Sequence, residues 1–188
     1  MSFSEPERRR ELAAEVFSRC YLTGEFTLRS GRSADRYFDK YQFESDPELL
    51  AALAAEMAAL VPDDVELLAG LEMGGIPVVT ALAAATGIPA AFVRKAAKEY
   101  GTARLAEGPS VAGKRVLIVE DVVTSGGQIR LSASDLANLG AVIVGAICVI
   151  DREEGGSEIL AEDGIALSSL FGGAELEAAG AAVPPSSG

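Results

Sequence analysis

The stretch that decides the fold is VLIVEDVVTSGGQ, residues 116–128. Its first four residues are apolar and three of them are β-branched, which is typical of a buried strand. Two adjacent carboxylates follow, Glu120 and Asp121, and then a Thr-Ser-Gly-Gly turn. The residues after the turn fit a helix that ends near Leu139. Strand, polar turn and helix in this order predict the beginning of a βαβ unit.

Each part of this stretch suits the binding of a sugar phosphate. Glycine lets the backbone approach a phosphate closely, and the N–H groups at a helix N-terminus favour an anion. The hydroxyls of Thr124 and Ser125 add donors. The carboxylates of Glu120 and Asp121 would repel a phosphate, so they indicate ribose hydroxyls or a Mg²⁺ ion with its waters. The plain alternative is that the two acids end a strand and cap the next helix.

Apolar runs recur along the chain with helix candidates between them. The strand candidates are 65–71, 90–93, 116–119, 142–150 and the weaker 165–170, and further helix candidates are 6–20, 47–60 and 77–86. Strands of continuous apolar character that alternate with helices predict a parallel sheet buried on both faces. Ligands of such α/β sheets bind at the carboxyl ends of the strands.

One helix is especially well marked. Asp46 is a good N-cap because Pro47 follows it at the first helical position. A 4, 4, 3 spacing then places four apolar residues on one helical face: Leu49, Leu53, Met57 and Leu60.

A chain of 188 residues predicts one domain, 1–188. Residues 22–43 lack a clean period and are rich in aromatic residues, so we expect them, with C-terminal elements, to form a small hood. The hood would cover one end of a core at about 46–156. The tail, about 180–188, is rich in small residues, Pro and Ser, which predicts flexibility.

Charge and hydropathy exclude several classes of protein. With 28 acidic and 16 basic residues the formal net charge is −12, which argues against nucleic-acid binding. No apolar run is long enough to cross a membrane. The first residues carry charges but no apolar signal region, so we expect a cytoplasmic protein.

The sequence has no histidine and two cysteines. A Ser-His-Asp triad, a Cys-His pair and a His-ligated zinc site are therefore excluded. Cys148 lies in the apolar run 141–150 and is expected to be a reduced, buried thiol. Acid–base chemistry must fall to carboxylates, Lys, Tyr or the substrate.

A basic island stands out in this acidic chain. The segment RKAAKEYGTAR, residues 94–104, holds four of the 16 basic residues. One interpretation is a solvated, mobile surface loop. The other is a cationic lid that closes over a polyanion, with Gly101 as a hinge, and that neutralises charge on a leaving group.

Residues 116–127 resemble the ribose-5-phosphate signature of type I phosphoribosyltransferases. The island resembles the catalytic loop of the orotate-specific members, Arg-Lys-x-x-Lys-x-[His/Tyr]-Gly. Three further stretches are similar to family elements: the hood segment 26–31, the pyrophosphate loop 70–77 and an Asp-Arg-x-Glu element at 151–154. The resemblance implies the type I phosphoribosyltransferase fold, an α/β fold with a parallel sheet flanked by helices and a small N-terminal hood.

The resemblance also implies roles for individual residues. Lys98 and Asp121 would be catalytic, and Thr124 and Arg152 would bind orotate, although an Arg after a strand is by itself more often a surface ion-pair partner. Arg29 in the hood would meet 5-phosphoribosyl 1-diphosphate (PRPP), and Gly74 stands where some members have Lys. The PRPP-binding residues would be Arg94, Lys95, Lys98, Tyr100, Glu120, Asp121, Val122, Val123, Thr124, Ser125, Gly126, Gly127 and Gln128.

The expected reaction is orotate phosphoribosyl transfer from PRPP to give orotidine 5′-monophosphate and pyrophosphate, a step of UMP biosynthesis. Mg²⁺ is the expected cofactor, bound mainly through PRPP and water rather than by a protein cage. The resemblance further implies a homodimer in which Lys95 and the 94–104 loop reach the partner's site. Three alternatives stay open: a phosphoribosyltransferase for another base, a PRPP-sensing regulatory module, and a noncatalytic flavodoxin-like domain.

Overall fold

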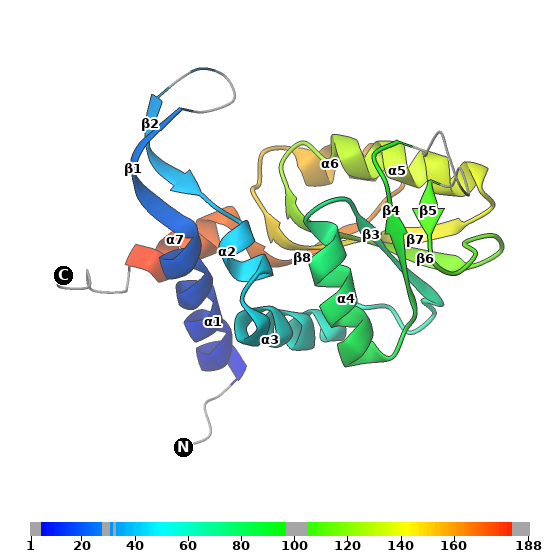
Figure 1. Ribbon diagram of the computed structural model, residues 1–188, viewed down its shortest axis with the longest axis horizontal. Helices are drawn as coiled ribbons and strands as arrows, with labels where there is room; N and C mark the ends of the chain where they lie inside the picture. The colour runs from blue at the N-terminus through cyan, green and yellow to red at the C-terminus, as the bar shows by residue number, and fades with distance from the viewer. Residues whose placement is uncertain (1–4, 28–30, 32, 97–104, 182–188) are drawn as a thin grey trace.

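The computed structural model describes residues 5–27, 31, 33–96 and 105–181. Its helices are α1 Glu5–Cys20, α2 Tyr41–Glu44, α3 Pro47–Met57, the short 3₁₀ helix η1 Ala58–Leu60, α4 Gly75–Thr86, α5 Gly127–Asn138, α6 Gly156–Glu162 and α7 Gly173–Ala181 (Figure 1). Its strands are β1 Tyr21–Thr27, β2 Ser33–Phe38, β3 Leu67–Leu71, β4 Ala90–Val93, β5 Ala106–Glu107, β6 Arg115–Val123, β7 Val142–Asp151 and β8 Leu167–Gly172.

Six strands form the central sheet in the order β5-β4-β3-β6-β7-β8. All neighbours in it are parallel except β4 and β5. Helices α3 and α4 pack on one face, and α5 and α6 cover the other (Figure 1). This confirms the predicted α/β sheet, because strands buried on both faces need a helix layer on each side.

The hood begins with a hairpin. Strands β1 and β2 pair antiparallel and project away from the sheet (Figure 1), and α2 leads back to the core. Helix α7 lies beside α1 at the base of the hairpin (Figure 1). Arg9 joins α1 to the C-terminal elements, because its guanidinium pairs with Glu175 at 2.8 Å and donates to the carbonyl of Leu170. Segments from both ends of the chain therefore share this end of the molecule.

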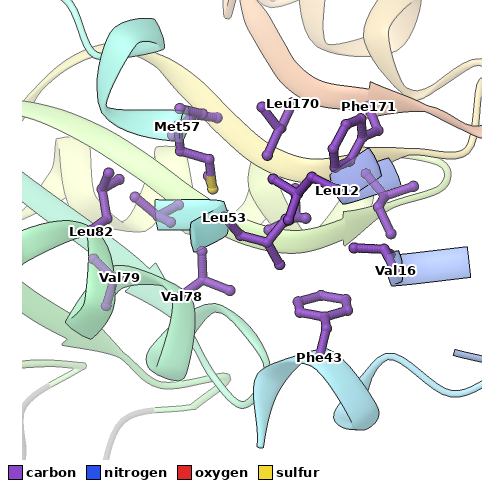
Figure 2. Close-up of a cluster of buried hydrophobic side chains, with 14 of the residues drawn as sticks. Leu12, Val16, Phe43, Leu53, Met57, Val78, Val79, Leu82, Leu170 and Phe171 are labelled. Atoms are coloured by element: carbon purple, nitrogen blue, oxygen red, sulfur yellow. The ribbon is translucent and has the colours of Figure 1, made fainter. Parts of the chain in front are cut away.

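A cluster of buried side chains ties the hood helices to the sheet. Figure 2 shows that it draws on α1, α2, α3, α4 and β8, with Leu12, Val16, Phe43, Leu53, Met57, Val78, Val79, Leu82, Leu170 and Phe171 labelled. Phe43 is fully buried. Burial of a side chain of this size stabilises the fold by about 2–3 kcal/mol, so Phe43 anchors α2 to the hydrophobic core.

Helix boundaries follow the local signals. Asp46 accepts hydrogen bonds from the backbone N–H groups of Glu48 and Leu49, at 3.0 and 2.9 Å, so it is the predicted N-cap of α3. Gly87 ends α4 in the left-handed conformation, with φ 75°. Both cysteines are buried free thiols. Among the residues described, none of the helices is both long and apolar enough to span a bilayer.

The structure differs from the sequence expectations at several elements. Strand β6 continues to Val123, so the acid pair lies inside the strand rather than after it, because pairing with β7 persists to the register Val123–Asp151. Strand β5 and helices α6 and α7 were not expected from the pattern. Helix α7 runs to Ala181, while residues 182–188 lie outside the described residues.

Candidate active site

The candidate site lies at the carboxyl ends of the neighbouring strands β3 and β6. These two strands are neighbours, but β3 continues through α4 to β4 on one side and β6 continues through α5 to β7 on the other. Their connecting helices lie on opposite faces of the sheet. Such a reversal of strand order leaves a crevice at the carboxyl ends of the strands, which is where α/β sheets bind ligands.

The acid pair lies at this crevice because β6 extends beyond the end of its pairing with β3. The register between the two strands ends at Gly70–Val119, so the next residues of β6 have no partner on that side. Each carboxylate accepts a hydrogen bond from the backbone N–H of the next residue. Glu120 Oε1 accepts from Asp121 at 3.2 Å, and Asp121 Oδ1 accepts from Val122 at 2.7 Å. Both side chains are buried.

Two residues that the sequence did not single out join the acid pair. The ammonium group of Lys40, just before α2, pairs with Asp121 Oδ2. The carboxyl group of Glu44, in α2, is buried, and its Oε1 lies with Asp121 Oδ2 beside the backbone of Gly74. Three carboxyl groups and one ammonium group therefore meet beneath the crevice. No local pattern reveals this, because Lys40 and Glu44 reach the site only through the packing of α2.

The close packing of these groups raises the pKa values of Glu44 and Glu120 and lowers that of Asp121. Burial, followed by the hydrogen bond and charge of Asp121, raises the pKa of Glu120 to about 9 and that of Glu44 to about 8. Burial opposes ionisation of Asp121 as well, but hydrogen bonds from Glu120, Glu44 and Lys40 outweigh it and lower its pKa. The cluster thus holds an ionised Asp121 and binds protons at its other carboxyl groups near neutral pH.

The turn at 124–127 exposes an uncapped helix N-terminus. Gly126 is left-handed, with φ 70°, and no side chain among the described residues caps α5. A Cβ at Gly126 would lie 2.9 Å from Leu160 Cγ and 3.0 Å from the carbonyl oxygen of Gly156, so glycine allows the turn to pack on α6. Thr124 and Ser125 are exposed, and Gln128 donates to Ser132 Oγ at 3.2 Å. The geometry is that of an anion cradle.

A second glycine turn borders the crevice from β3. Gly74 and Gly75 follow this strand and open α4. A Cβ at Gly74 would overlap the carboxylate of Asp121, and at Gly75 it would lie 2.5 Å from the carbonyl oxygen of Val119. The backbone of this turn therefore touches β6 directly, which only glycine permits.

Strand β4 brings the start of the basic island to the same edge of the sheet. Arg94 directly follows β4, is half-buried, and donates its backbone N–H to the carbonyl of Leu105 at 2.9 Å. Lys95 is exposed. The predicted site residues Lys98 and Tyr100, like Arg29 of the hood, lie outside the described residues.

Arg152 directly follows β7 and borders the site on the side opposite β4. The backbone N–H of Arg152 donates to the carbonyl of Val123 at 2.9 Å, which fixes the backbone of Arg152 next to the 124–127 turn. Its guanidinium lies 3.6 Å from Glu154, and its charge acts on Tyr21, a hood residue stacked on Phe17. Burial nonetheless raises the pKa of Tyr21, so its hydroxyl stays a hydrogen-bond donor.

The next acid in this element has a structural role. Glu153 adopts φ 58° and accepts from the backbone N–H of Ala174 at 2.8 Å, at the start of α7. A carboxylate at a helix N-terminus is favourable because the N–H groups there lack partners within the helix. Glu153 therefore fixes the end of β7 that carries Arg152.

Four chain segments thus converge at one edge of the sheet. They offer hydrogen-bond acceptors at Glu120 and Asp121, backbone donors at the 124–127 turn, and cations at Arg94 and Arg152. Such a site can hold a molecule that carries both hydroxyl and phosphate groups.

Comparisons with known proteins show the family of this chain. Residues 42–169 match the family described as "Phosphoribosyl transferase domain". The chain is 51% identical to an orotate phosphoribosyltransferase of Nocardioides sp. over 168 residues, which are 89% of this chain and 94% of the relative. It is 43% identical to an orotate phosphoribosyltransferase of Halobacterium salinarum, over 81% of this chain and 87% of the relative.

Solved structures give the same result. Orotate phosphoribosyltransferase of Mycobacterium tuberculosis in complex with Fe(III) dicitrate superposes with a TM-score of 0.83 at 37% identity, over 90% of this chain and 98% of that one. The same enzyme in complex with PRPP superposes with a TM-score of 0.78 at 33% identity, over 90% of this chain and 99% of that one. An adenine phosphoribosyltransferase of Thermoanaerobacter pseudethanolicus, at 22% identity and a TM-score of 0.65, shares the fold. The chain therefore belongs to the orotate phosphoribosyltransferases, a family of pentosyltransferases.

Proposed function

We propose that this chain catalyses transfer of the 5-phosphoribosyl group from PRPP to orotate. The bond between C1 of the ribose and the pyrophosphate oxygen breaks, a bond from orotate N1 to C1 forms, and the N1 proton passes to the leaving pyrophosphate or to water. Because pyrophosphate can take this proton, the reaction needs no strong general base from the protein. This agrees with a chain that has no histidine. The protein's contribution is then positioning of the reactants and stabilisation of charge.

The ribose and its 5-phosphate are assigned to β6 and the turn after it. Glu120 and Asp121 accept hydrogen bonds from the ribose 2- and 3-hydroxyls, which are donors. The 5-phosphate binds backbone N–H groups of the 124–127 turn and the hydroxyls of Thr124 and Ser125. Support comes from the uncapped N-terminus of α5 and from the buried acid pair beside it.

Orotate is assigned to the end of β7. Its carboxylate suits the guanidinium of Arg152, which can bind both oxygens at once. Thr124 contributes a hydroxyl from the neighbouring turn. Support comes from the backbone hydrogen bond that joins Arg152 to Val123.

The leaving pyrophosphate is assigned to the basic island. Arg94 and Lys95 follow β4 at the crevice edge, and Lys98 and Tyr100 are proposed to complete the contacts. We assign Lys98 the catalytic role of neutralising charge that develops on the pyrophosphate. In the proposed homodimer, Lys95 and the 94–104 loop serve the partner's site.

Mg²⁺ is the proposed cofactor. Mg²⁺ takes oxygen ligands and usually keeps several waters, so the buried carboxylates of Glu120 and Asp121 suit its water shell rather than the ion itself. The ion would therefore be held largely by PRPP oxygens and water beside the acid pair. When bound, it would supply positive charge against the pyrophosphate.

The observation that carries the proposal is the meeting of the acid pair, the phosphate turn and Arg152 at one sheet edge. The test is release of pyrophosphate from PRPP, measured with orotate, adenine, guanine or uracil, with and without Mg²⁺. We expect release with orotate and Mg²⁺ only. Release with another base alone would overturn the substrate, and PRPP binding without release under any condition would overturn the enzymatic proposal.

A further inference from the structure

Lys40 connects the hood to the acid pair. It lies between β2 and α2, and its ammonium group pairs with Asp121 Oδ2 on the central strand β6. The side chain of Lys40 is 33% exposed, whereas that of Asp121 is 1% exposed. The pair thus joins a half-buried hood cation to a buried core carboxylate. Phe43, fully buried three residues later, holds this segment in place.

The titratable groups that face Lys40 are carboxyl groups, apart from Tyr41, whose ring centre lies 5.5 Å from the ammonium nitrogen. Glu44 approaches it from α2, Glu120 and Asp121 approach it from β6, and Asp39 precedes it in the chain. The β3–α4 turn contributes only Gly74 here, whose added Cβ would lie 2.7 Å from Glu44 Oε1. Within the described part of the chain, Lys40 is the cation that contacts these carboxyl groups.

This arrangement has a direct electrostatic consequence. An ionised carboxylate removed from water is strongly unfavourable unless a cation or hydrogen-bond donors compensate it. Burial lowers the pKa of Lys40, but the hydrogen bond and the charge of Asp121 outweigh burial and raise it. Lys40 is therefore charged near neutral pH, and Asp121 is ionised beside it.

We propose that Lys40 is a positioning residue for PRPP binding: it keeps Asp121 ionised and aimed at the crevice, so that Asp121 can accept a ribose hydroxyl. The inference rests on the proposed function and adds to it a hood residue that sets the affinity for PRPP. Lys40 acts through Asp121 and not through orotate. Its loss therefore changes the Michaelis constant for PRPP and leaves that for orotate unchanged.

The primary test compares Lys40→Met with wild type by steady-state kinetics from pH 5.5 to 9. In Lys40→Met we expect the KM for PRPP at pH 7 to rise about tenfold or more, because a charged hydrogen bond to Asp121 is lost. The KM for orotate should stay within about twofold. Wild type should show no acid limb from Asp121 in this range, because its pKa is lowered, whereas in Lys40→Met such a limb should appear at the acid end, because Asp121 without its cation protonates more readily. Lys40→Arg keeps the charge and should keep the wild-type pH profile.

Lys114→Met is the matched control. Lys114 also makes one ion pair, with Glu66 at 2.9 Å, but it precedes β6 at the opposite end of the strand. This variant should keep both Michaelis constants. If Lys40→Met only lowers thermal stability, with both constants and the pH profile as in wild type, the positioning role is wrong. Wild type without orotate-dependent turnover would instead overturn the proposed function.

A cysteine variant distinguishes the effect of losing the charge at position 40 from an effect on folding. Cys20 and Cys148 are fully buried, so in Lys40→Cys the new thiol is the one expected to react with 2-bromoethylamine. Aminoethylation restores an ammonium group on a stem of similar length. We expect kcat/KM for PRPP to recover several-fold in the same folded preparation. No recovery after complete modification would contradict the inference, and this comparison decides the case if Lys40→Met does not fold.

Discussion

The carboxylate of Asp121 occupies the space in which a side chain at Gly74 would lie. A Cβ there would overlap Asp121 and would come within 2.7 Å of Glu44 Oε1. The glycine turn after β3 and the acid pair of β6 are therefore one packed unit. The affinity of the site for PRPP should respond to changes on either side of this contact.

Gly74→Ala tests this contact. We expect the added methyl group to displace the Asp121 carboxylate and to raise the KM for PRPP about tenfold, because a charge-assisted hydrogen bond is lost. Gly113→Ala is the control: Gly113 has φ 74° and open space around it, so alanine costs about 1 kcal/mol of stability without touching the site. An unchanged KM for PRPP in Gly74→Ala would show that the contact does not matter for binding.

Arg152→Gln should affect the other substrate. Loss of the guanidinium removes the paired hydrogen bonds to the orotate carboxylate, and we expect the KM for orotate to rise by about 10–100-fold. The KM for PRPP should change little. Arg130→Gln is a suitable control, since Arg130 is an exposed residue of α5 that pairs with the exposed Asp163 at 2.9 Å. Equal effects on both Michaelis constants would argue that Arg152 supports the fold instead.

Lys98→Ala and Asp121→Asn test the shared active site together. Lys98→Ala should lower kcat far more than it weakens PRPP binding, because its charge is needed as pyrophosphate leaves. If each site of a dimer takes Lys98 from one subunit and Asp121 from the other, mixing the two inactive variants restores one intact site in each heterodimer. Statistical mixing then recovers about a quarter of the wild-type activity. Full activity of Lys98→Ala alone, or no recovery on mixing, would contradict the assignment.

The buried carboxyl groups predict how stability depends on pH. The pKa values of Glu44 and Glu120 are raised to about 8 and 9, so between pH 4.5 and these values the folded state binds more protons than the unfolded state. Stability from these groups is therefore fully present below about pH 4.5 and is lost as pH rises. Asp121, whose pKa is lowered, acts in the opposite sense, and its contribution is lost only in strong acid.

We accordingly expect the free energy of unfolding of the ligand-free protein to fall as pH rises from about 5 to 9. In Glu44→Gln the slope between pH 5 and 8 should be shallower, by up to roughly 1 kcal/mol per pH unit. Urea unfolding at several pH values measures this. Glu158→Gln, at an exposed position in α6, is the control and should keep the wild-type slope. A wild-type stability that rises steadily to pH 9 would show that Glu44 and Glu120 are ionised in the folded state.

The sequence predicted the parts of the fold that depend on short segments. Residues 116–128 combine β-branched residues, two acids and two glycines in one order, and β6, the turn and α5 follow that order. Asp46 capped α3 as expected, because capping is a contact with the next three residues. The convergence of Arg94, the acid pair and Arg152 followed from topology, since carboxyl ends of parallel strands share one edge.

Other features depend on contacts between distant segments and had no local signal. Helix α7 is built of Ala, Gly and Glu with a single leucine, so its sequence has no apolar stripe, and it is held by the buried Leu176 and by the ion pair of Arg9 with Glu175. Lys40 meets Asp121 across 81 positions of sequence, because Phe43 anchors α2 in the core. The strand β6 was predicted too short because its last residues pair with β7 and not with β3.

The most direct test of the account is a crystal structure of the protein with PRPP and Mg²⁺. We predict that the ribose 2- and 3-hydroxyls lie within hydrogen-bond distance of the Glu120 and Asp121 carboxylates, with the 5-phosphate at the N-terminus of α5. A sugar phosphate bound away from the β3–β6 crevice, or an acid pair that makes no contact with the diol, would contradict it.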